Sequence, residues 1–371
     1  MNRPRICFSL LNYQKSTHRH YFHIYEFIEA LSHRADVRLL VMDAEDPPEF
    51  EHPAAVIDLT GHGMWARWCR CREIIRSRML GYTVFYHHYT TAPARFSSVI
   101  NRLTGGRTYL WHCIVMEALD DIVKTSRVQR MMLRWTFRMV HHLVTGTEFM
   151  ADYYASRYPI RRESIRVVPN YLNIHRFRRD AVDTRQLRQR LSIPDDRKIV
   201  LYLHEIEEGR AALLPAIITG VLDRRADVVF VVAGDGRYRG ELETRLAAQV
   251  RDRTVLFTGR VANTDTPWFY AGADLFIMTS QFEAFSRVLL EAMAMGTPYV
   301  ATDGGGNIRT YTPENHQEFI LSRENWDCFP ERIDCLLDDR DRIAAFIACG
   351  YDHVQAYSMD RIVELFLQTI R

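Results

Sequence analysis

Short apolar runs alternate along this chain with longer segments whose apolar residues recur every three or four positions. In the first half the runs are 6–11, 37–42, 55–59, 82–86, 108–111 and 142–145, and in the second half 199–203, 228–233, 255–258, 273–278 and 299–301. Between the first two runs, Ile24, Ile28 and Leu31 show the helical spacing. This alternation predicts an α/β fold with doubly wound parallel sheets.

The most informative stretch is 276–306, FIMTSQFEAFSRVLLEAMAMGTPYVATDGGG. Its first apolar run ends in a polar turn, and Glu283 and Glu291 follow eight residues apart with helical apolar spacing between them. Gly296 and Pro298 end that helix, and a second apolar run leads into three glycines. The pattern predicts a strand–helix–strand unit that binds ligands at the carboxyl ends of its strands.

The two glutamates carry the candidate chemistry of this unit. Glu283 precedes the predicted helix and Glu291 lies inside it, so both side chains can face one crevice. A carboxylate accepts two hydroxyl donors, which suits a ribose or a hexose, and the glycines allow a backbone to approach the ligand closely. The spacing alone fits equally well with a helix-capping Glu283 and a solvated Glu291.

The stretch resembles the E-x7-E signature of the retaining glycosyltransferases of family 4. The matching letters are Ser280, Glu283, Glu291-Ala292-Met293-Ala294, Gly296, Pro298, Val300-Ala301-Thr302-Asp303 and Gly305. The resemblance implies the GT-B fold, in which two Rossmann-like domains face each other across a cleft. It also implies a UDP-type or GDP-type sugar donor, with Glu283 at the sugar and Glu291 at the nucleotide ribose. Neither a metal nor another cofactor is expected.

Further donor-side candidates follow from the same resemblance. Arg210 stands where the family has a lysine on the donor diphosphate, whereas Glu205 replaces an arginine and reverses its charge. Because like charges about 4 Å apart repel by about 1–4 kcal/mol, Glu205 points away, or another arginine such as Arg260 substitutes, or donor use is altered. The remaining candidates are Gly234, Gly236, Gly259, Ser286, Arg287 and Gly305.

Histidines in the first half follow predicted strands. His112 comes directly after 108–111 and matches a family histidine that lies beside the transferred sugar, so it joins Glu283 and Arg210 as a catalytic candidate. A structural histidine is the alternative. The loop after the first strand lacks the glycines usual in the family. Candidate acceptor-side residues are Lys15, His18, His87, His88 and Asn170.

The length allows two domains, each with its own core. We expect residues 1–175 to form an acceptor-side Rossmann-like domain and 176–197 a polar linker. Residues 198–358 are expected to form the domain that binds the nucleotide sugar. The resemblance implies that a helix over 359–371 packs back on the first domain.

The net charge of +2 hides an asymmetry along the chain. Residues 1–180 carry 26 Lys and Arg against 17 Asp and Glu, and the remainder carries 22 against 29. Arginines concentrate in 64–82 and 127–142, among tryptophans and methionines. Both segments predict contact with an anionic membrane surface, and the alternative is a solvated helix face. No known nucleic-acid motif accompanies the charge, so no nucleic-acid partner is expected.

Other features bear on the compartment. Seven cysteines at irregular spacing predict reduced thiols. The chain has no 18-residue apolar run that would predict a transmembrane helix, and its first apolar stretch is too short for a signal peptide. We therefore expect a cytoplasmic protein, peripheral at the inner membrane face.

Three functions remain open. The first is a retaining, metal-independent glycosyltransferase, hexosyltransferase in type, that serves cell-surface polysaccharide or glycoconjugate synthesis and acts on a glycan or lipid-linked acceptor. The second is a catalytically impaired GT-B relative that acts as a binding or scaffold subunit, which Glu205 motivates. The third is another GT-B activity, such as an epimerase or a phosphorylase. A phosphorylase needs a pyridoxal-phosphate lysine. The only lysines are Lys15, Lys124 and Lys198, and none lies in the predicted site of the second domain, so this function ranks last.

Overall fold

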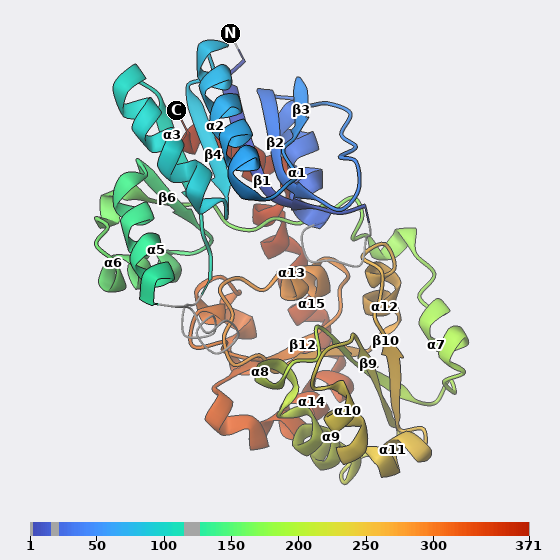
Figure 1. Ribbon diagram of the computed structural model, residues 1–371. Coiled ribbons are helices and arrows are strands. Elements are labelled where there is room, and N and C mark those ends of the chain that lie inside the picture. Colours follow the sequence, from blue (N-terminus) through green and yellow to red (C-terminus); the bar gives the residue numbers. More distant parts are fainter. Residues whose placement is uncertain (1–2, 16–21, 115–126, 371) are drawn as a thin grey trace. The chain divides into compact units, whose positions relative to one another are not determined.

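The fold is described from a computed structural model, over residues 3–15, 22–114 and 127–370. The chain forms two compact units, each built around one parallel sheet (Figure 1). Unit 1 consists of Met1–Pro169 and Met359–Arg371, and unit 2 consists of Asn170–Ser358.

The sheet of unit 1 has seven strands within the described residues, in the order β3-β2-β1-β4-β5-β6-β7. Its central strands are apolar on both faces, as a parallel sheet covered by helices requires, and Phe8 and Leu39 are fully buried. The strands are β1 (Arg5–Tyr13), β2 (Asp36–Ala44), β3 (Ala55–Asp58), β4 (Val84–His88), β5 (Arg107–Trp111), β6 (His142–Thr145) and β7 (Ile165–Val167).

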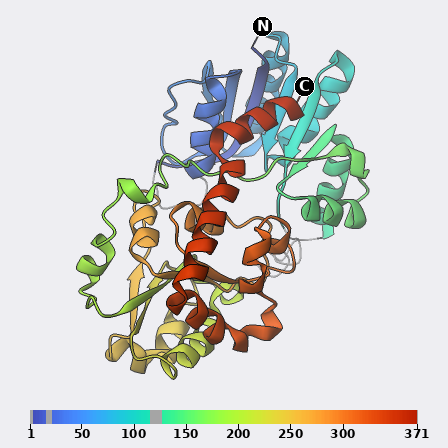
Figure 2. The ribbon, with the colours of Figure 1, turned by 180° about the vertical axis from the view of Figure 1, so that it is seen from behind.

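Helices cover both faces of this sheet. Figures 1 and 2, seen from opposite sides, place α2 and α3 on one face and the C-terminal α16 on the other. α16 packs on α1, where the Phe27 and Phe366 rings meet edge to face with centroids 5.3 Å apart. The helices are α1 (Phe22–Ser32), α2 (Gly63–Met79), α3 (Thr91–Thr104), α5 (Arg127–Met139), α6 (Glu148–Arg157), the 3-10 turn η1 (Arg162–Ser164) and α16 (Met359–Thr369).

The sheet of unit 2 has six strands in the order β10-β9-β8-β11-β12-β13. Apolar runs predicted all of them except β13, which is only two residues long. The strands are β8 (Lys198–Leu203), β9 (Val228–Ala233), β10 (Val255–Gly259), β11 (Leu275–Met278), β12 (Tyr299–Thr302) and β13 (Ile320–Leu321). The predicted α/β fold with two Rossmann-like parallel sheets is confirmed.

Unit 2 also contains the stretch 176–197, which was expected as a linker. Its helix α7 packs on α12 through the buried Leu187 and through Arg190, which lies 4.7 Å from the Trp268 ring. The helices are α7 (Gln186–Leu191), α8 (Glu208–Ala211), α9 (Leu214–Leu222), α10 (Arg239–Arg245), α11 (Ala247–Arg251), α12 (Thr266–Gly272), α13 (Arg287–Ala294), α14 (Phe329–Asp338) and α15 (Arg340–Val354). The 3-10 turns are η2 (Arg179–Ala181), η3 (Ile308–Thr310), η4 (Glu314–Phe319), η5 (Arg323–Cys328) and η6 (Gln355–Tyr357).

One strand differs from its predicted bounds in a way that affects the site. The run 82–86 was expected to end before His87, but β4 extends to His88 because it pairs with β1, with Ser9 opposite His87 and Leu10 opposite His88. Both histidines therefore lie inside the strand rather than beyond its end.

No helix in the described parts of the chain combines the length and the apolar character needed to cross a bilayer.

Candidate functional site

The candidate site lies at the carboxyl edge of the sheet in unit 2. In this sheet β8 lies between β9 and β11, so the strand order reverses direction at the β8–β11 pair. Crevices at such reversals are the usual ligand sites of open α/β sheets. The loops that follow β8 and β11 leave the sheet at this reversal, and they carry His204 and Glu283.

Glu283 is held by its own backbone. Its N–H donates to the Gly304 carbonyl at 3.2 Å, and its carbonyl accepts from Asn307 Nδ2 at 2.9 Å. Gly304 has φ of +57°, and a Cβ there would lie 3.0 Å from the Glu283 Cβ. The glycine turn after β12 therefore fits against the loop after β11, which fixes the direction of the Glu283 side chain.

The Glu283 carboxylate is buried beside the His204 ring. His204 Nε2 lies 3.5 Å from Glu283 Oε1, which is longer than an ordinary hydrogen bond of about 3 Å. His204 Nδ1 accepts the Glu205 N–H at 2.8 Å, so a neutral ring carries its proton on Nε2 and points it at the carboxylate. Within the described residues, Glu283 Oε1 has no partner at ordinary hydrogen-bond distance.

Burial and nearby charge set the protonation of this pair. Burial lowers the pKa of His204 below its usual 6.5, and the Arg210 charge lowers it further, so the ring is neutral at neutral pH. Burial alone would raise the pKa of Glu283, but the His204 N–H and the Arg210 charge outweigh it and lower that pKa to about 2. The site therefore holds a buried carboxylate with an incompletely bonded oxygen.

Glu291 lies on the second turn of α13 and is buried. Its Oε2 accepts from the Tyr270 hydroxyl at 3.2 Å, and its Oε1 lies 3.6 Å from Arg287 Nη2. Burial and the Glu291 charge raise the pKa of Tyr270 well above its usual value, so the phenol stays a donor. A carboxylate accepts hydrogen bonds from several donors, which is the acceptor chemistry that ribose hydroxyls require.

Glu205, which reverses the charge expected at the diphosphate, pairs with Arg210 in the structure. Glu205 Oε2 and Arg210 Nη1 form an ion pair at 2.6 Å, with side-chain exposures of 62% and 33%. The Arg210 carbonyl accepts from the Thr279 hydroxyl, and the Gly209 carbonyl accepts from the Gln281 N–H at 2.8 Å. The loop after β11 is therefore tied to α8, and in this structure Glu205 points toward Arg210.

The Gly-Asp-Gly turn after β9 has a steric requirement of its own. A Cβ at Gly234 would lie 1.9 Å from the His204 carbonyl oxygen, and one at Gly236 would lie 2.3 Å from the Ile206 carbonyl oxygen. The Gly234 N–H donates to the Gly259 carbonyl at 2.8 Å. These glycines let the loop after β8 pass close to the turn, so their direct role is to place His204.

Of the other donor-side candidates, Ser286 and Gly305 form hydrogen bonds within the protein, and Arg260 is exposed. Ser286 directly precedes α13, and its N–H and Oγ donate to Tyr311 and Met278. The Gly305 N–H donates to Asp303 Oδ1 at 3.2 Å. Arg260 is exposed just after β10. The described residues contain no group of three or more His, Cys, Asp and Glu side chains placed to hold a metal ion.

His112 of unit 1 follows β5, as predicted, and is buried. Its Nδ1 lies 2.6 Å from the Tyr154 hydroxyl, which also donates to the Ile114 carbonyl and accepts the Ile114 N–H. All of these bonds are satisfied when His112 carries its proton on Nδ1, which leaves Nε2 as an acceptor. Burial lowers the pKa of His112 to about 4, so the ring is neutral.

The acceptor-side candidates differ in burial and in their partners. His87 is fully buried, with Nε2 2.7 Å from Ser97 Oγ and Nδ1 3.3 Å from Thr90 Oγ1, so in this structure it is a bonded core residue, and a contact with the acceptor stays a prediction. His88 is buried against the Trp111 ring. Lys15 pairs with Glu49 on the surface. Asn170 is half-buried at the start of unit 2, and His18 lies outside the described residues.

Three partners in these arrangements were missed by the sequence reasoning. No role was assigned to His204, Tyr270 or Tyr154 from the sequence, and only contacts between distant segments identify them as partners. The position of His204 at the end of a predicted strand was the one available signal.

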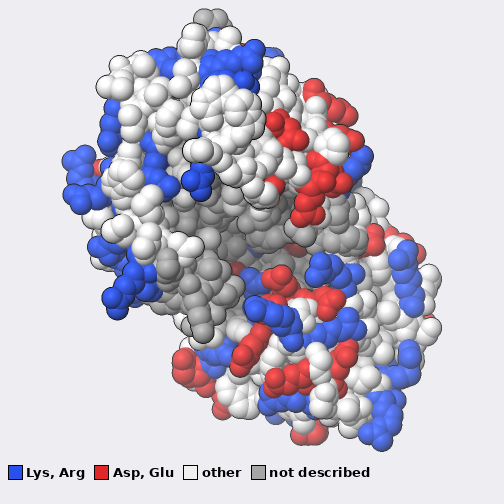
Figure 3. Space-filling view, in the orientation of Figure 1, with Lys and Arg blue, Asp and Glu red and all other residues white. Residues whose placement is uncertain are grey.

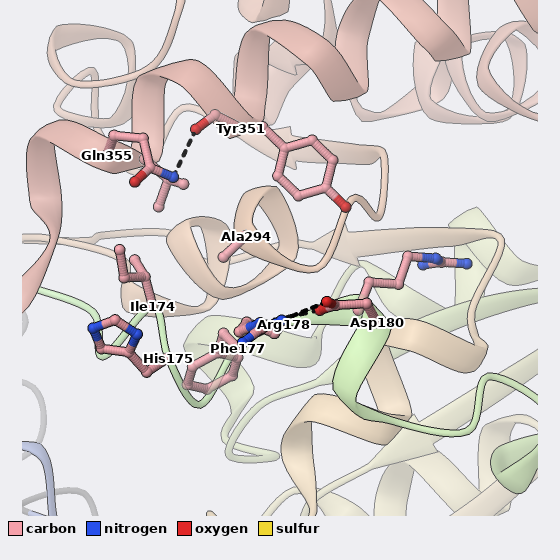
Figure 4. Close-up of a pocket in the computed structure, with 10 residues that line it drawn as sticks. Ile174, His175, Phe177, Arg178, Asp180, Ala294, Tyr351 and Gln355 are labelled. Carbon is pink, nitrogen blue, oxygen red and sulfur yellow. Dashed lines mark hydrogen bonds and ion pairs between the residues drawn. The ribbon is translucent and has the colours of Figure 1, made fainter.

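Unit 2 also has a surface cavity of about 680 Å³. It is lined by Ile174, Phe177, Ala294, Tyr351 and Gln355, and Figure 4 shows Tyr351 and Gln355 across from Ile174 and Phe177. Ala294 is the last residue of α13, whereas Glu283 precedes its first turn. The cavity is therefore at the opposite end of α13 from Glu283.

Comparison with known families gives two matches. The family "Glycosyl transferases group 1" matches residues 183–353, and "Glycosyltransferase Family 4" matches residues 22–176. Together the two matches span most of the chain, and each falls largely on one unit.

Two curated relatives show the extent of the likeness. One is the alpha-monoglucosyldiacylglycerol synthase of Streptococcus pneumoniae, 31% identical over 52% of this chain and 45% of that protein. The other is the GDP-mannose-dependent monoacylated alpha-(1-6)-phosphatidylinositol monomannoside mannosyltransferase of Corynebacterium glutamicum, 30% identical over 57% of this chain and 59% of that protein. The chain thus spans about half the length of the curated relatives it matches.

Solved structures resemble the whole chain. Anabaena HepE in complex with UDP-glucose has a TM-score of 0.76 at 17% identity, over 99% of both chains. Sucrose-phosphate synthase from Thermosynechococcus elongatus has a TM-score of 0.73 at 17% identity, over 99% of this chain and 98% of the other. At this level of identity the likeness concerns the fold. With the two family matches, it shows that this chain belongs to the family 4 type of glycosyltransferases, which have the GT-B fold.

Proposed function

We propose that this chain is a retaining, metal-independent hexosyltransferase that moves a sugar from a UDP-type or GDP-type donor to a glycan or lipid-linked acceptor. Its setting is cell-surface polysaccharide or glycoconjugate synthesis. Two named relatives, one a glucosyldiacylglycerol synthase and the other a GDP-mannose-dependent transferase, support this class of reaction.

In the proposed mechanism unit 2 binds the donor. Glu291 accepts the ribose hydroxyls, oriented by Tyr270 and Arg287, and Glu283 contacts the sugar through its incompletely bonded Oε1. Arg210 neutralises the diphosphate as charge develops on it. His112 keeps the role that the resemblance implies, which is to orient the transferred sugar through Nε2.

The chemical step is a same-face displacement at the anomeric carbon. The acceptor hydroxyl forms the new C–O bond as the bond to the diphosphate breaks, and its proton passes to an oxygen of the leaving phosphate. A neutral His204 beside an ionised Glu283 suits this step, because a carboxylate stabilises positive charge on the sugar ring. No side chain has to remove the proton in this scheme.

The acceptor belongs to the same proposal. A lipid-linked acceptor would be met at a membrane face, and 64–82 and 127–142 are the segments that would contact it. The protein would then be peripheral at the cytoplasmic side of the inner membrane.

The single observation that carries the proposal is the buried, ionised Glu283, whose Oε1 lies 3.5 Å from His204 Nε2 and has no partner at ordinary hydrogen-bond distance in the described structure. Such an oxygen is costly to leave unsatisfied, by about 1–3 kcal/mol, which favours a hydroxyl ligand. The test is a thermal-shift and hydrolysis screen against UDP-, GDP-, ADP- and TDP-sugars. Stabilisation by one of them, lost in Glu291→Gln, is the expected result, and stabilisation by none would sink the proposal.

The Glu205–Arg210 ion pair favours a second function. If the pair persists when ligand is present, Arg210 is not available to the diphosphate, and the chain would act as a binding or scaffold subunit. In that case a nucleotide or glycan would stabilise the protein without turnover. Restoring turnover with Glu205→Gln would decide in favour of the enzyme.

A further inference from the structure

Exposed apolar side chains gather on three helices of unit 1, α2, α3 and α5. Of the fifteen large apolar side chains that are exposed in the described structure, eleven belong to these helices or to Leu80 directly after α2. Met64, Met79 and Leu103 are 87%, 82% and 80% exposed, and Trp65 is 72% exposed. We call the exposed residues of the three helices the α2–α3–α5 surface.

The three helices form one continuous surface. α3 packs against α2 on one side and α5 on the other. Arg95 of α3 donates to Thr136 of α5 at 2.7 Å, and Arg102 of α3 donates to the Met139 carbonyl of α5 at 2.9 Å. Arg78 of α2 donates to Thr104 Oγ1 of α3 at 2.8 Å. Side chains therefore fix the positions of the helices relative to one another.

Four of the exposed apolar residues of α2 lie in one stripe along the helix. Met64, Trp68, Ile75 and Met79 are spaced by four, seven and four residues, which places them on one side. Trp65 and Trp68 stack with centroids 5.0 Å apart, and the Arg72 guanidinium lies 5.2 Å from the Trp68 ring. Tryptophan and arginine side by side are typical of residues that sit at a membrane interface.

On α5 the exposed apolar residues and the arginines form adjacent stripes. Val128, Met131 and Trp135 are exposed at spacings of three and four, beside the exposed Arg127 and Arg134. Thr136 and Phe137 face the core instead. The arginines of α5, which belong to the basic segment 127–142, are therefore exposed in one stripe, and an apolar stripe runs beside it.

The charge of these helices has one sign. α2, α3 and α5 contain five, two and four arginines and a single carboxylate, Glu73. Glu73 is 2% exposed and is bound to Arg38 at 2.7 Å in the core, so the surface itself presents no carboxylate. Over these helices Figure 3 shows uncharged surface crossed by arginines.

This combination discriminates among the partners that would cover the surface. A second copy of the chain would bring its own arginines against these, which like-charge repulsion opposes. Nucleic acid would match the charge, but it offers no apolar phase for methionine, leucine and valine. An anionic phospholipid bilayer offers both a negative surface and an apolar layer within a few ångströms of it.

We propose that the α2–α3–α5 surface docks on an anionic phospholipid bilayer, with the apolar stripes in the interface and the arginines at the headgroups. The inference deepens the proposed function by naming the partner that would present the acceptor. Its structural basis lies wholly in unit 1, whereas donor binding is assigned to unit 2.

The test is co-flotation of the full chain, without donor, with vesicles of phosphatidylcholine alone or mixed with phosphatidylglycerol. We expect binding to the mixed vesicles only, weakened by salt. Arg67→Gln with Arg134→Gln should lower the partition by roughly 10- to 30-fold, since each basic residue contributes about fivefold. Trp65→Ser with Trp68→Ser should weaken binding at every salt concentration. The matched controls Trp326→Ser and Arg251→Glu, both in unit 2, should bind like the unaltered chain.

Three results would overturn the proposal. They are failure to float with anionic vesicles, equal binding to neutral vesicles, and a dimer that the Trp65→Ser, Trp68→Ser chain converts to monomer. The substituted positions are exposed, and stabilisation by the nucleotide sugar in the same variants confirms that they fold. Lost flotation with intact donor binding sinks only the bilayer inference, and lost donor binding with intact flotation sinks only the proposed function.

Discussion

The two ends of the candidate donor site in unit 2 are built differently. At the carboxylate end, Glu283 and Glu291 are buried, and each has partners from distant segments of the chain. At the cation end, Glu205 and Arg210 pair with each other, five residues apart, and Glu205 is exposed while Arg210 is half-buried. One end is fixed by packing, and the other depends on an exposed ion pair.

This difference determines how each end responds to a ligand or a substitution. The partners of a buried carboxylate hold it in one position, so its geometry is set before the ligand binds. An exposed ion pair contributes about 0–1 kcal/mol, so a diphosphate can displace it easily. The comparison predicts large effects on chemistry at the carboxylate end and small effects on affinity at the cation end.

The largest expected effect is that of Glu283→Gln. The amide keeps the shape of the side chain but removes the charge beside the sugar, so turnover should fall by roughly 10²- to 10³-fold. Nucleotide affinity should stay nearly unchanged, because the contact is with the sugar. Turnover and thermal shift are measured on one preparation, with Glu207→Gln as the control. Unchanged turnover would remove Glu283 from the mechanism.

Glu291→Gln should act on binding instead. Loss of the charged acceptor should raise the nucleotide Kd by about 10- to 100-fold. Tyr270→Phe removes only one donor to the same carboxylate and should raise the Kd by about 2- to 10-fold. Titration calorimetry with the nucleotide alone measures both. If Tyr270→Phe costs as much as Glu291→Gln, the carboxylate acts through its position rather than as a ligand.

His204 should determine how turnover depends on pH, because it lowers the pKa of Glu283. In His204→Ala the side chain that lowers the pKa of Glu283 is gone, so burial should raise that pKa from about 2. Turnover should then fall by roughly tenfold, and an acid limb should appear in its pH profile. His204→Gln can accept from the Glu205 N–H and donate to Glu283, so it should restore most activity. If the profiles of the two variants coincide, His204 has no role in positioning Glu283.

The same groups predict the direction of acid destabilisation. The folded-state pKa of Glu283 lies below its ordinary value of 4.5, so the stability it contributes is present above pH 4.5 and lost as pH falls toward 2. The pKa of His204 is also lowered, so the folded state loses stability as pH falls below 6.5. Thermal unfolding should therefore occur at lower temperature in acid, and less steeply so in His204→Gln.

The fold was predictable because its strands are continuous apolar runs. β9 has the predicted bounds, and β8 and β11 are within two residues of theirs. β4 was placed wrongly because His87 and His88 are polar, and pairing with β1 rather than composition makes them strand residues. β13 has two residues, too few for any periodicity.

The candidate site was predictable where it rests on local order along the chain. Glu283 before the helix and Glu291 inside it follow from spacing, and the structure confirms both positions. The contact of His204 with Glu283 joins segments 79 residues apart, and no pattern encodes it. The Glu205–Arg210 pair is local, but sequence could not decide whether Glu205 turns toward Arg210 or away, because exposed side chains are not fixed by packing.

The smallest expected effect concerns that pair and tests the comparison most directly. Glu205→Gln releases Arg210, so the Kd for a nucleoside diphosphate should fall by about two- to fivefold at low salt, and less at high salt. Arg210→Gln should raise the Kd. In the double variant the Glu205→Gln gain should vanish, because it acts only through Arg210. If Glu205→Gln weakens binding, Glu205 contacts the ligand itself, and the cation end is then as much a part of the binding site as the carboxylate end.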